Sequence, residues 1–406
     1  MDELSLYEKI LNLSKPWFVE GVSFDELTKT VTVHVAADSD ENHQCPTCKT
    51  LCPGYDSRKR TWRHLDTCQY KTLVTTDVPR VECPTHGCVT VNVPWAEERS
   101  RFTLLFESEV INRLQSASVL AICTQLRMSW NAVDGIMRRA VARGQSRLSQ
   151  VMPTHICVDE VAIKKGHIYM TIISEPCGNV ICVEEDRKKE SLKRFYDRLT
   201  DGQKDAIKVI SMDMSPAYLA VTLEEIPNAR EKIAFDRFHV VKLINEAVDG
   251  VRKQETRALH KTLKEAGLTG KRYHWLKNAA SLSANQRGEL RSLKAIALKT
   301  GRAWLLKEYA RELWNYSSRA WAKKAWMKWY GKAIRSRLKP MQMVARSVKK
   351  NLWGILNAIV LRANNGIAES INSKIKMLKV KCRGFRNSER FKTAIMFHCG
   401  GLSLHP

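Results

Sequence analysis

Two aspartates follow or interrupt apolar, strand-like segments at positions where metal ions could bind. Segment 207–212 is β-prone and leads directly into Asp213, and segment 155–163 carries Asp159. Side chains alternate along a strand, so Glu160 should point away from the face that Asp159 occupies. Carboxylate oxygens are common Mg²⁺ ligands, and two such ions can serve phosphoryl transfer. Asp159 and Asp213 are therefore candidate magnesium ligands.

A third carboxylate for this site is Glu369, in the segment ANNGIAESINSKIK. The isoleucines of this segment, beginning at Ile367, recur at helical spacing and predict a buried stripe. Glu369 falls on another face of that helix, together with Asn365, Asn372 and Lys376. Amide and lysine neighbours suit a metal and a phosphate, although a solvated Glu on an amphipathic helix gives the same pattern.

Asp236 and His239 form a further pair in FDRFHV, directly after a short apolar run. A histidine at this place could orient a carboxylate or a scissile phosphate. A capping Asp followed by a structural His has the same spacing.

Cysteines near the N-terminus are spaced as metal ligands. CPTC supplies Cys45 and Cys48, and CPTHGC supplies Cys83, His86 and Cys88. Each knuckle places two soft ligands about one tight turn apart, as tetrahedral Zn²⁺ requires. Two further cysteines between the knuckles leave other choices of four open. We predict one structural zinc ion here.

The elements around the two aspartates must bring them together. Three strand-like runs, at 155–163, 167–174 and 179–186, are followed by a helix, the strand that ends at Asp213, a second helix and a short strand at 232–235. If the fourth strand pairs beside the first, Asp159 and Asp213 lie side by side. That arrangement is the ribonuclease H-like topology, and residues 240–362 then follow as long basic helices.

Two amphipathic segments between 118 and 144 flank the polar turn RMSW, and this pattern predicts a helix-turn-helix. Ser129 is a plausible N-cap of the second helix. The first helix has a packed face that includes Leu120, and the second has Arg138, Arg139 and Arg143 on its exposed side. Such a helix can enter a major groove, although two packed helices without a DNA role give the same pattern.

The charge is unevenly distributed along the chain. The 406 residues carry a net charge of +25, which indicates a polyanionic partner such as nucleic acid. Residues 251–350 hold 26 Lys and Arg against five Glu. Six tryptophans lie between 275 and 329, and we assign most of these rings to packing. The first residues resemble no secretory signal, and no run is long and apolar enough for a membrane span.

The motifs CVDEVAIKKGHIYMTIIS, VISMDMSPAY, AFDRFHVVKLINEAVDGVR and NNGIAESINSKIKMLKVKCRGFRN resemble the ISL-three family of bacterial insertion-sequence transposases. RTWRHLD and VECPTHG near the start are also similar to that family. The resemblance implies a DDE triad at Asp159, Asp213 and Glu369, with a helical insertion between the second Asp and the Glu.

The same resemblance bears on the remaining candidates. The family commonly carries a Cys-x2-His second knuckle, which ranks His86 above Cys88 as the fourth zinc ligand. Several DDE transposase groups with helical insertions have a Cys- or Asp-x2-His pair near the active site, as at Asp236 and His239.

The sequence thus predicts a multidomain α+β chain. The expected parts are an N-terminal zinc-binding module (1–100), a helix-turn-helix segment (101–150), an α/β ribonuclease H-like catalytic domain (151–240), a basic helical insertion (241–362), and a second catalytic part with the Glu-bearing helix (363–406).

The predicted function is that of a DNA transposase of a bacterial insertion sequence, which cleaves element ends and transfers strands. Expected cofactors are two Mg²⁺ ions per active site, replaceable by Mn²⁺, and one structural Zn²⁺. Expected partners are terminal inverted repeats, target DNA and further copies of the chain, in the bacterial cytoplasm at the nucleoid and without a membrane. One alternative is a ribonuclease H-like DNA nuclease or resolvase. The other is a non-catalytic zinc-dependent DNA-binding regulator derived from a transposase. Candidate DNA contacts are Arg138, Arg139, Lys323, Lys324, Lys328, Lys374 and Lys376.

Overall fold

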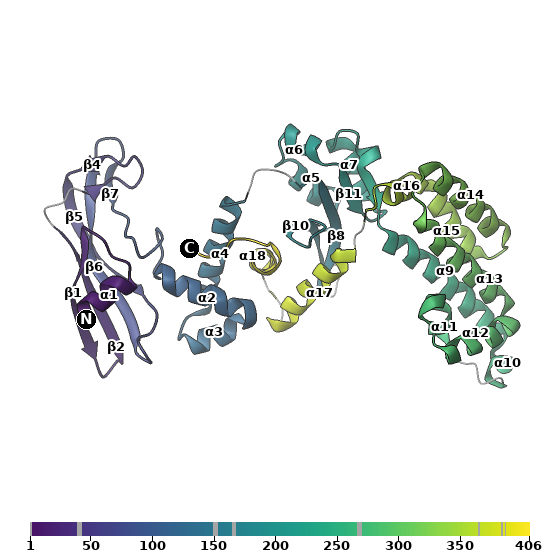
Figure 1. Cartoon of the computed structure of the whole chain (residues 1–406), viewed down its shortest axis with the longest axis horizontal. Helices are drawn as coiled ribbons and strands as arrows, with labels where there is room; N and C mark the ends of the chain where they lie inside the picture. The colour runs from purple at the N-terminus through teal and green to yellow at the C-terminus, as the bar shows by residue number, and fades with distance from the viewer. Residues whose placement is uncertain are drawn as a thin grey trace. The chain divides into compact units, whose positions relative to one another are not determined.

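The computed structural model describes the backbone of residues 2–38, 43–148, 153–164, 168–265, 270–363, 366–382, 385 and 387–406. The chain forms two compact units: unit 1 is Met1–Leu148 with Leu402–Pro406, and unit 2 is Ser149–Gly401. Figure 1 draws residues 1–148 in purple to blue and unit 2 in teal to yellow. Within the described ranges, the helices are all too short or too polar to cross a membrane.

Unit 1 begins with a β-sheet in the strand order β1–β2–β6–β5, with β7 beside β6. The elements of this part are α1 (Glu3–Ile10), β1 (Trp17–Asp25), β2 (Thr30–Ala37), β3 (His43–Gln44), β4 (Leu51–Cys52), β5 (Gly54–Arg63), β6 (Lys71–Cys83) and β7 (Gly87–Thr90). Along β2 the valines alternate inward as a two-residue period requires, and Val33 is fully buried. The sequence pattern did not predict β1, where the register shifts between Val19 and Gly21 and breaks the alternation.

Three helices follow in unit 1: α2 (Leu104–Ser116), α3 (Val119–Gln125) and α4 (Trp130–Ser146). The predicted cap is confirmed, because the Ser129 side chain accepts a hydrogen bond from the Ala132 N–H. Val133 and Ile136 of α4 are fully buried. The predicted packing of Leu120 is wrong, since this side chain is 63% exposed while Val119 and Ile122 supply the buried face of α3.

The predicted exposure of the α4 arginines is also wrong for two of the three. Glu107 of α2 is completely buried and pairs with both Arg139 and Arg143. A buried carboxylate is stable only with charged or hydrogen-bonding partners, so α4 turns these two guanidinium groups inward. Arg143 also pairs with Glu97 at 2.6 Å and donates to the Leu404 carbonyl oxygen. The last five residues of the chain are therefore fastened to α4.

Unit 2 contains a five-stranded sheet in the order β10–β9–β8–β11–β12. Its strands are β8 (His155–Lys164), β9 (Ile168–Ser174), β10 (Val180–Glu185), β11 (Val209–Met212) and β12 (Ile233–Phe235). β8, β9 and β10 pair antiparallel, whereas β11 pairs in parallel with both β8 and β12. The strands expected from the sequence are present, and the fourth strand pairs beside the first as predicted.

Helices surround the sheet and then continue into a long helical segment (Figure 1). The first four are α5 (Lys189–Tyr196), α6 (Asp201–Ala206), α7 (Pro216–Glu225) and α8 (Ala229–Lys232), and the next eight are α9 (Arg237–Ala258), α10 (His260–Glu265), α11 (Arg272–Leu276), α12 (Ala284–Ile296), α13 (Leu298–Glu312), α14 (Arg319–Arg335), α15 (Lys339–Lys350) and α16 (Leu352–Val360). α16 packs against β12, where Gly354 lies so close to the Phe235 ring that a Cβ would clash with it.

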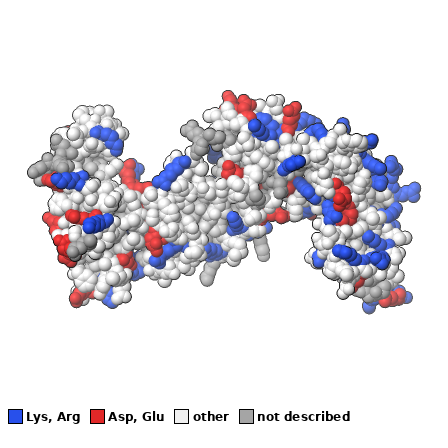
Figure 2. Space-filling view, viewed as in Figure 1, with Lys and Arg blue, Asp and Glu red and all other residues white. Residues whose placement is uncertain are grey.

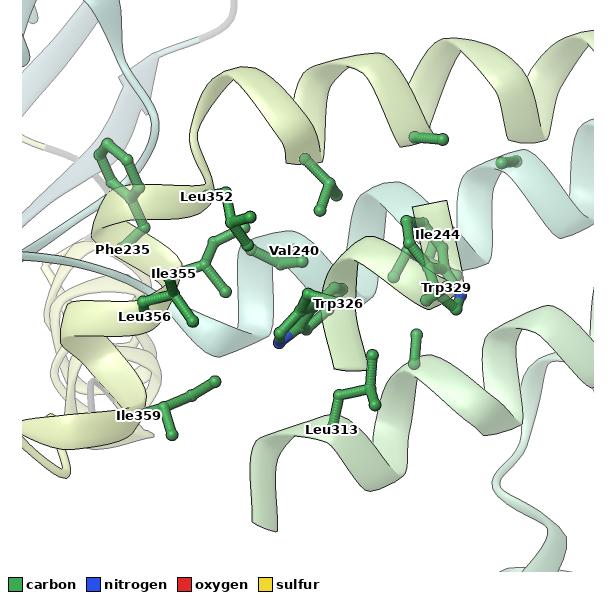
Figure 3. Close-up of a cluster of buried hydrophobic side chains, with 14 of the residues drawn as sticks. Phe235, Val240, Ile244, Leu313, Trp326, Trp329, Leu352, Ile355, Leu356 and Ile359 are labelled. Carbon is green, nitrogen blue, oxygen red and sulfur yellow. The ribbon is translucent and has the colours of Figure 1, made fainter. Parts of the chain in front are cut away.

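The helical segment shares one hydrophobic core with the sheet. Figure 3 shows Val240 and Ile244 of α9, Trp326 and Trp329 of α14, and Ile355 of α16 in this core. Most of the tryptophans expected to pack are indeed buried, and the Trp329 indole N–H donates to the Leu306 carbonyl oxygen at 2.8 Å. Trp314 is partly buried, and Trp321 has 62% of its surface exposed.

The chain returns to the sheet with α17 (Gly366–Lys381), which packs on β8, and α18 (Ser388–Cys399), which packs on β10. Ile371 and Ile375 of α17 are buried as the stripe predicts. Asn365 and the side chain of Ile367 lie outside the described residues. α17 therefore lies beside the strand that carries Asp159.

Candidate functional site

The two predicted aspartates lie next to each other at the sheet. Val158 of β8 pairs with Met212 of β11 in parallel register, so the following residues, Asp159 and Asp213, occupy neighbouring positions at the end of the shorter strand. The Asp159 carboxylate accepts hydrogen bonds from the Glu160 backbone N–H at 2.8 Å and from the Asn372 amide at 2.7 Å. Asn372 belongs to α17, so this helix and β8 hold the carboxylate in one orientation.

Asp159 is costly to keep ionised in this place. Burial raises the pKa of its carboxyl to about 6, and the negative charge of Asp213 adds to that rise. Ionised Asp159 at neutral pH therefore costs the metal-free protein roughly 3 kcal/mol. A divalent cation between the two aspartates would remove this cost.

Asp213 is also part of a cluster with Asp236 and His239, whose ligand atoms lie within 4.8 Å of one another. His239 Nδ1 contacts Asp213 Oδ1 and is 3.0 Å from Asp236 Oδ2. Burial opposes the charged imidazolium, but the two carboxylates outweigh it and raise the pKa of His239 to about 10. The first oxygen of Asp236 accepts from the Phe238 N–H at 3.0 Å and caps α9. Asp236 therefore caps α9, as one reading of the sequence expects, and it also contacts His239.

The structure does not bring Glu369 into this cluster. Glu369 is exposed in the first turn of α17, three residues before Asn372, which corresponds to a rise of about 4.5 Å along the helix. Glu160 is separate as well and pairs with Arg187 at 3.4 Å. The sequence pattern indicated Asn372 only as a neighbour of Glu369 on one face of the helix. That shared face was the only sign in the sequence that Asn372 could contact Asp159.

The donor set at the strand ends fits a divalent cation such as Mg²⁺. Asp159, Asp213 and Asp236 offer carboxylate oxygens, and the Asn372 amide oxygen is buried without a hydrogen-bond partner among the described residues. Hard cations take carboxylate and amide oxygens as ligands. A divalent cation bound by Asp159 would also give this unpaired amide oxygen a partner, because Asn372 is hydrogen-bonded to Asp159.

The zinc ligands predicted from the knuckles do lie together. Cys45, Cys48, Cys83 and His86 have ligand atoms within 4.8 Å of one another, with the Cys48 and Cys83 sulfurs 3.5 Å apart. Hydrogen bonds from Thr50 hold the pKa of the Cys48 thiol at about 6, which favours the thiolate that a metal needs. Cys88, the alternative fourth ligand, is exposed on β7, and the described cluster does not include it.

We expect wild-type protein purified without chelator to contain about one Zn²⁺ per chain, and Cys83→Ser to lower that content because a tetrahedral site loses one of its four ligands. Cys88→Ser is the matched control and should retain zinc. Elemental analysis measures both. Zinc retained in Cys83→Ser, or lost in Cys88→Ser, would contradict this ligand set.

The candidate DNA-contacting residues differ in their surroundings. Arg138 is 64% exposed and pairs loosely with Asp134 at 3.4 Å, whereas Arg139 is engaged with buried Glu107. Figure 2 shows lysine and arginine gathered over the helical segment of unit 2. The candidate lysines of α14 and α17 are all exposed: Lys323, Lys324, Lys328, Lys374 and Lys376.

Comparison with known proteins finds three family models that match successive segments of the chain. A model of the zinc finger of transposases IS204, IS1001, IS1096 and IS1165 matches residues 41–88, and a model of the helix-turn-helix domain of transposase family ISL3 matches residues 91–141. The DDE domain model of the same family, described as a transposase, matches residues 156–395. These three domains define a DDE transposase with a zinc finger and a helix-turn-helix domain. The chain belongs to the ISL3 family of insertion-sequence transposases.

Individual relatives extend the likeness over nearly the whole chain. The chain is 27% identical to the transposase for insertion sequence element IS1557 of Mycobacterium tuberculosis, covering 99% of this chain and 96% of that protein. It is 27% identical to the transposase for IS1001 of Bordetella parapertussis, covering 86% of each. A solved structure, the Drosophila P element transposase strand transfer complex, aligns over 76% of this chain and 94% of that chain at 10% identity and a TM-score of 0.39, a likeness too low to bear on the function of this chain.

Proposed function

We propose that this transposase cuts the ends of its own insertion sequence and joins the freed 3′ ends to target DNA, at a ribonuclease H-like site formed by Asp159, Asp213 and Glu369. The observation that carries the proposal is the parallel register of β8 and β11, by which Asp159 and Asp213 become neighbours. The helical segment between β12 and α17 would be an insertion into that catalytic domain.

Two Mg²⁺ ions, when bound by these carboxylates, would activate water or a 3′-hydroxyl as nucleophile and stabilise the leaving 3′-oxygen. The chain's own residues hold the ligands in place. Asn372 orients Asp159 through its amide hydrogen bond, and His239 lies between Asp213 and Asp236. Lys374 and Lys376 continue along the exposed side of α17, where they can receive the phosphates of the DNA strand.

The proposal divides DNA recognition between the units. Unit 1, with its zinc site and the helix-turn-helix of α3 and α4, would bind the terminal inverted repeats in a sequence-specific way. The basic helices of unit 2 would add affinity without sequence preference. A dimer or higher oligomer at the nucleoid, synapsing two element ends, completes the proposal.

The experiment that tests the function uses full-length protein and a labelled duplex of the element's end with target DNA. We expect Mg²⁺ or Mn²⁺ to support both strand cleavage and joining, and EDTA to prevent both. Cleavage without joining would indicate a nuclease or resolvase. Specific binding without cleavage in either metal would indicate a non-catalytic DNA-binding regulator and overturn the proposal.

Charge reversal of Lys323, Lys324 and Lys328 to glutamate should weaken binding to all DNA sequences alike, because lysines that meet phosphates read no sequence information. We expect the slope of log K against log salt to fall by roughly one for each lysine that no longer neutralises a phosphate. Fluorescence anisotropy over a salt series measures this slope.

The matched control reverses Lys188 and Lys189, which lie at the start of α5 and are paired with Asp186 and Glu224. That variant should keep the wild-type slope. An unchanged slope in the α14 variant would show that the exposed lysines of this helix do not meet DNA.

A further inference from the structure

A groove of about 340 Å³ runs along α9 from a point one residue away from the catalytic cluster. It lies between α9 and α11, and its lining includes Phe238, Lys242, Asn245 and Lys253 from α9 and Arg272 from α11. Phe238 directly precedes His239, and their rings meet edge to face with centroids 5.8 Å apart. The groove therefore begins beside the atoms that would hold the scissile phosphate.

The lining residues of α9 recur every three or four positions, so they form one stripe of the helix. The opposite stripe, which includes Val240, Ile244 and Val248, is buried in the common core. Figure 3 shows the first two of these side chains. Phe238 is 47% exposed. The aromatic ring of Phe238 therefore lines the groove and is not part of the hydrophobic core.

Asn245 gives the groove a specific polar group. Its side-chain oxygen is buried, and it accepts no hydrogen bond from the described residues. A buried acceptor without a partner costs about 1–3 kcal/mol, so a ligand that donates a hydrogen bond would recover this cost. The amide of asparagine is suited to the amino edge of a nucleobase.

Three cationic side chains and the two carboxylates of Glu246 and Asp249 lie along the groove, so its lining has a small net positive charge. Lys253 and Arg272 share one carboxylate, Asp249, each at 3.2 Å, and Lys242 is exposed on the same stripe. Phe238 and Lys253 are fifteen residues apart on α9, which is about 22 Å of helix. A short stretch of nucleic-acid backbone can span that length.

We propose that this groove receives an unpaired nucleotide of the DNA strand that flanks the cleavage site. Its base stacks on Phe238, its exocyclic amino group donates to the Asn245 oxygen, and the phosphates that follow it meet Lys242, Lys253 and Arg272. An unpaired base is required because a paired base in a duplex does not expose its face to an aromatic ring. The volume is at the small end of ligand sites and suits a single nucleotide. This inference rests on the proposed function, because it assumes that DNA is cut at the adjacent cluster.

The test compares two fluorescein-labelled probes bound to full-length protein in EDTA, so that no cleavage occurs. One probe is the paired duplex of the element's end, and the other is the same duplex with two unpaired adenosines at the cleavage position. Wild type should bind the second probe more tightly by roughly 5- to 100-fold, the range expected for stacking of one base. Phe238→Ala should lose this preference while its affinity for the paired probe is unchanged, and Phe238→Tyr should restore it.

Asn245→Ala should bind unpaired adenosines no more tightly than unpaired purine nucleotides that lack the exocyclic amino group, whereas wild type should prefer the adenosines. Gln254→Ala is the matched control, since Gln254 is exposed on α9 and does not line the groove. It should keep the wild-type preference.

Equal affinity of wild type for the two probes, or an undiminished preference in Phe238→Ala, would overturn this inference. Neither outcome bears on catalysis, which is measured separately as cleavage of the paired end in Mg²⁺. Conversely, wild type that never cleaves but prefers the unpaired probe would overturn the proposed function and leave a nucleotide-binding groove.

Discussion

Asp213→Ala should abolish both strand cleavage and strand joining by the full-length protein, while leaving binding of the element's end nearly unchanged. Asp213 lies beside Asp159 through the β8–β11 register and also contacts His239. Its loss would therefore remove a proposed metal ligand and release the histidine from one of its two carboxylates. The measurement is strand cleavage of a labelled element end in Mg²⁺ and in Mn²⁺, with Asp159→Ala expected to behave in the same way.

The matched control for these variants is Glu160→Ala. Glu160 neighbours Asp159 in sequence, but its carboxylate pairs with Arg187, so its removal should leave cleavage close to the wild-type rate. Full activity of Asp213→Ala would discard the two-metal mechanism. Loss of DNA binding or of zinc in that variant would instead show that it is misfolded.

The strand arrangement around Asp159 and Asp213 could be predicted from the sequence to a large extent, because local patterns and topology agreed there. Apolar runs with β-branched residues indicated the strands of unit 2, and pairing of the fourth strand beside the first placed Asp159 beside Asp213. Hydrophobic periodicity likewise indicated the buried stripe of α17. The pairing in β8–β11 then confirmed the side-by-side arrangement.

Predictions failed where long-range contacts decide what a side chain does. Spacing on α4 put Arg139 and Arg143 on an outer face, but the buried carboxylate of Glu107 holds both of them. Glu107 is itself polar and gave no signal of burial. Neither did the sequence indicate that Leu404, near the C-terminus, would receive a hydrogen bond from Arg143 in unit 1.

The family resemblance and the structure point to different residues as the third carboxylate of the site. Family resemblance assigns it to Glu369, and the described cluster instead contains Asp236 with Asp213 and His239. The two are compatible if Asp236 fixes His239 while α17 delivers Glu369 to the metal ions and the DNA phosphates. The Asn372–Asp159 hydrogen bond supports this, because it already ties α17 to the site one turn from Glu369.

Glu369→Ala should therefore abolish cleavage and joining, although its side chain is exposed and its loss should not destabilise the fold. The remaining aspartates cannot hold two divalent ions against a polyanionic substrate without a further acidic ligand. Glu389→Ala is the matched control, because Glu389 is also an exposed glutamate in the first turn of a helix, α18, where it pairs with Lys392. Glu389→Ala should keep wild-type cleavage in the same assay with labelled ends. If Glu369→Ala were fully active and Asp236→Ala inactive, the third ligand would be Asp236, and α17 would contribute only the positioning amide of Asn372.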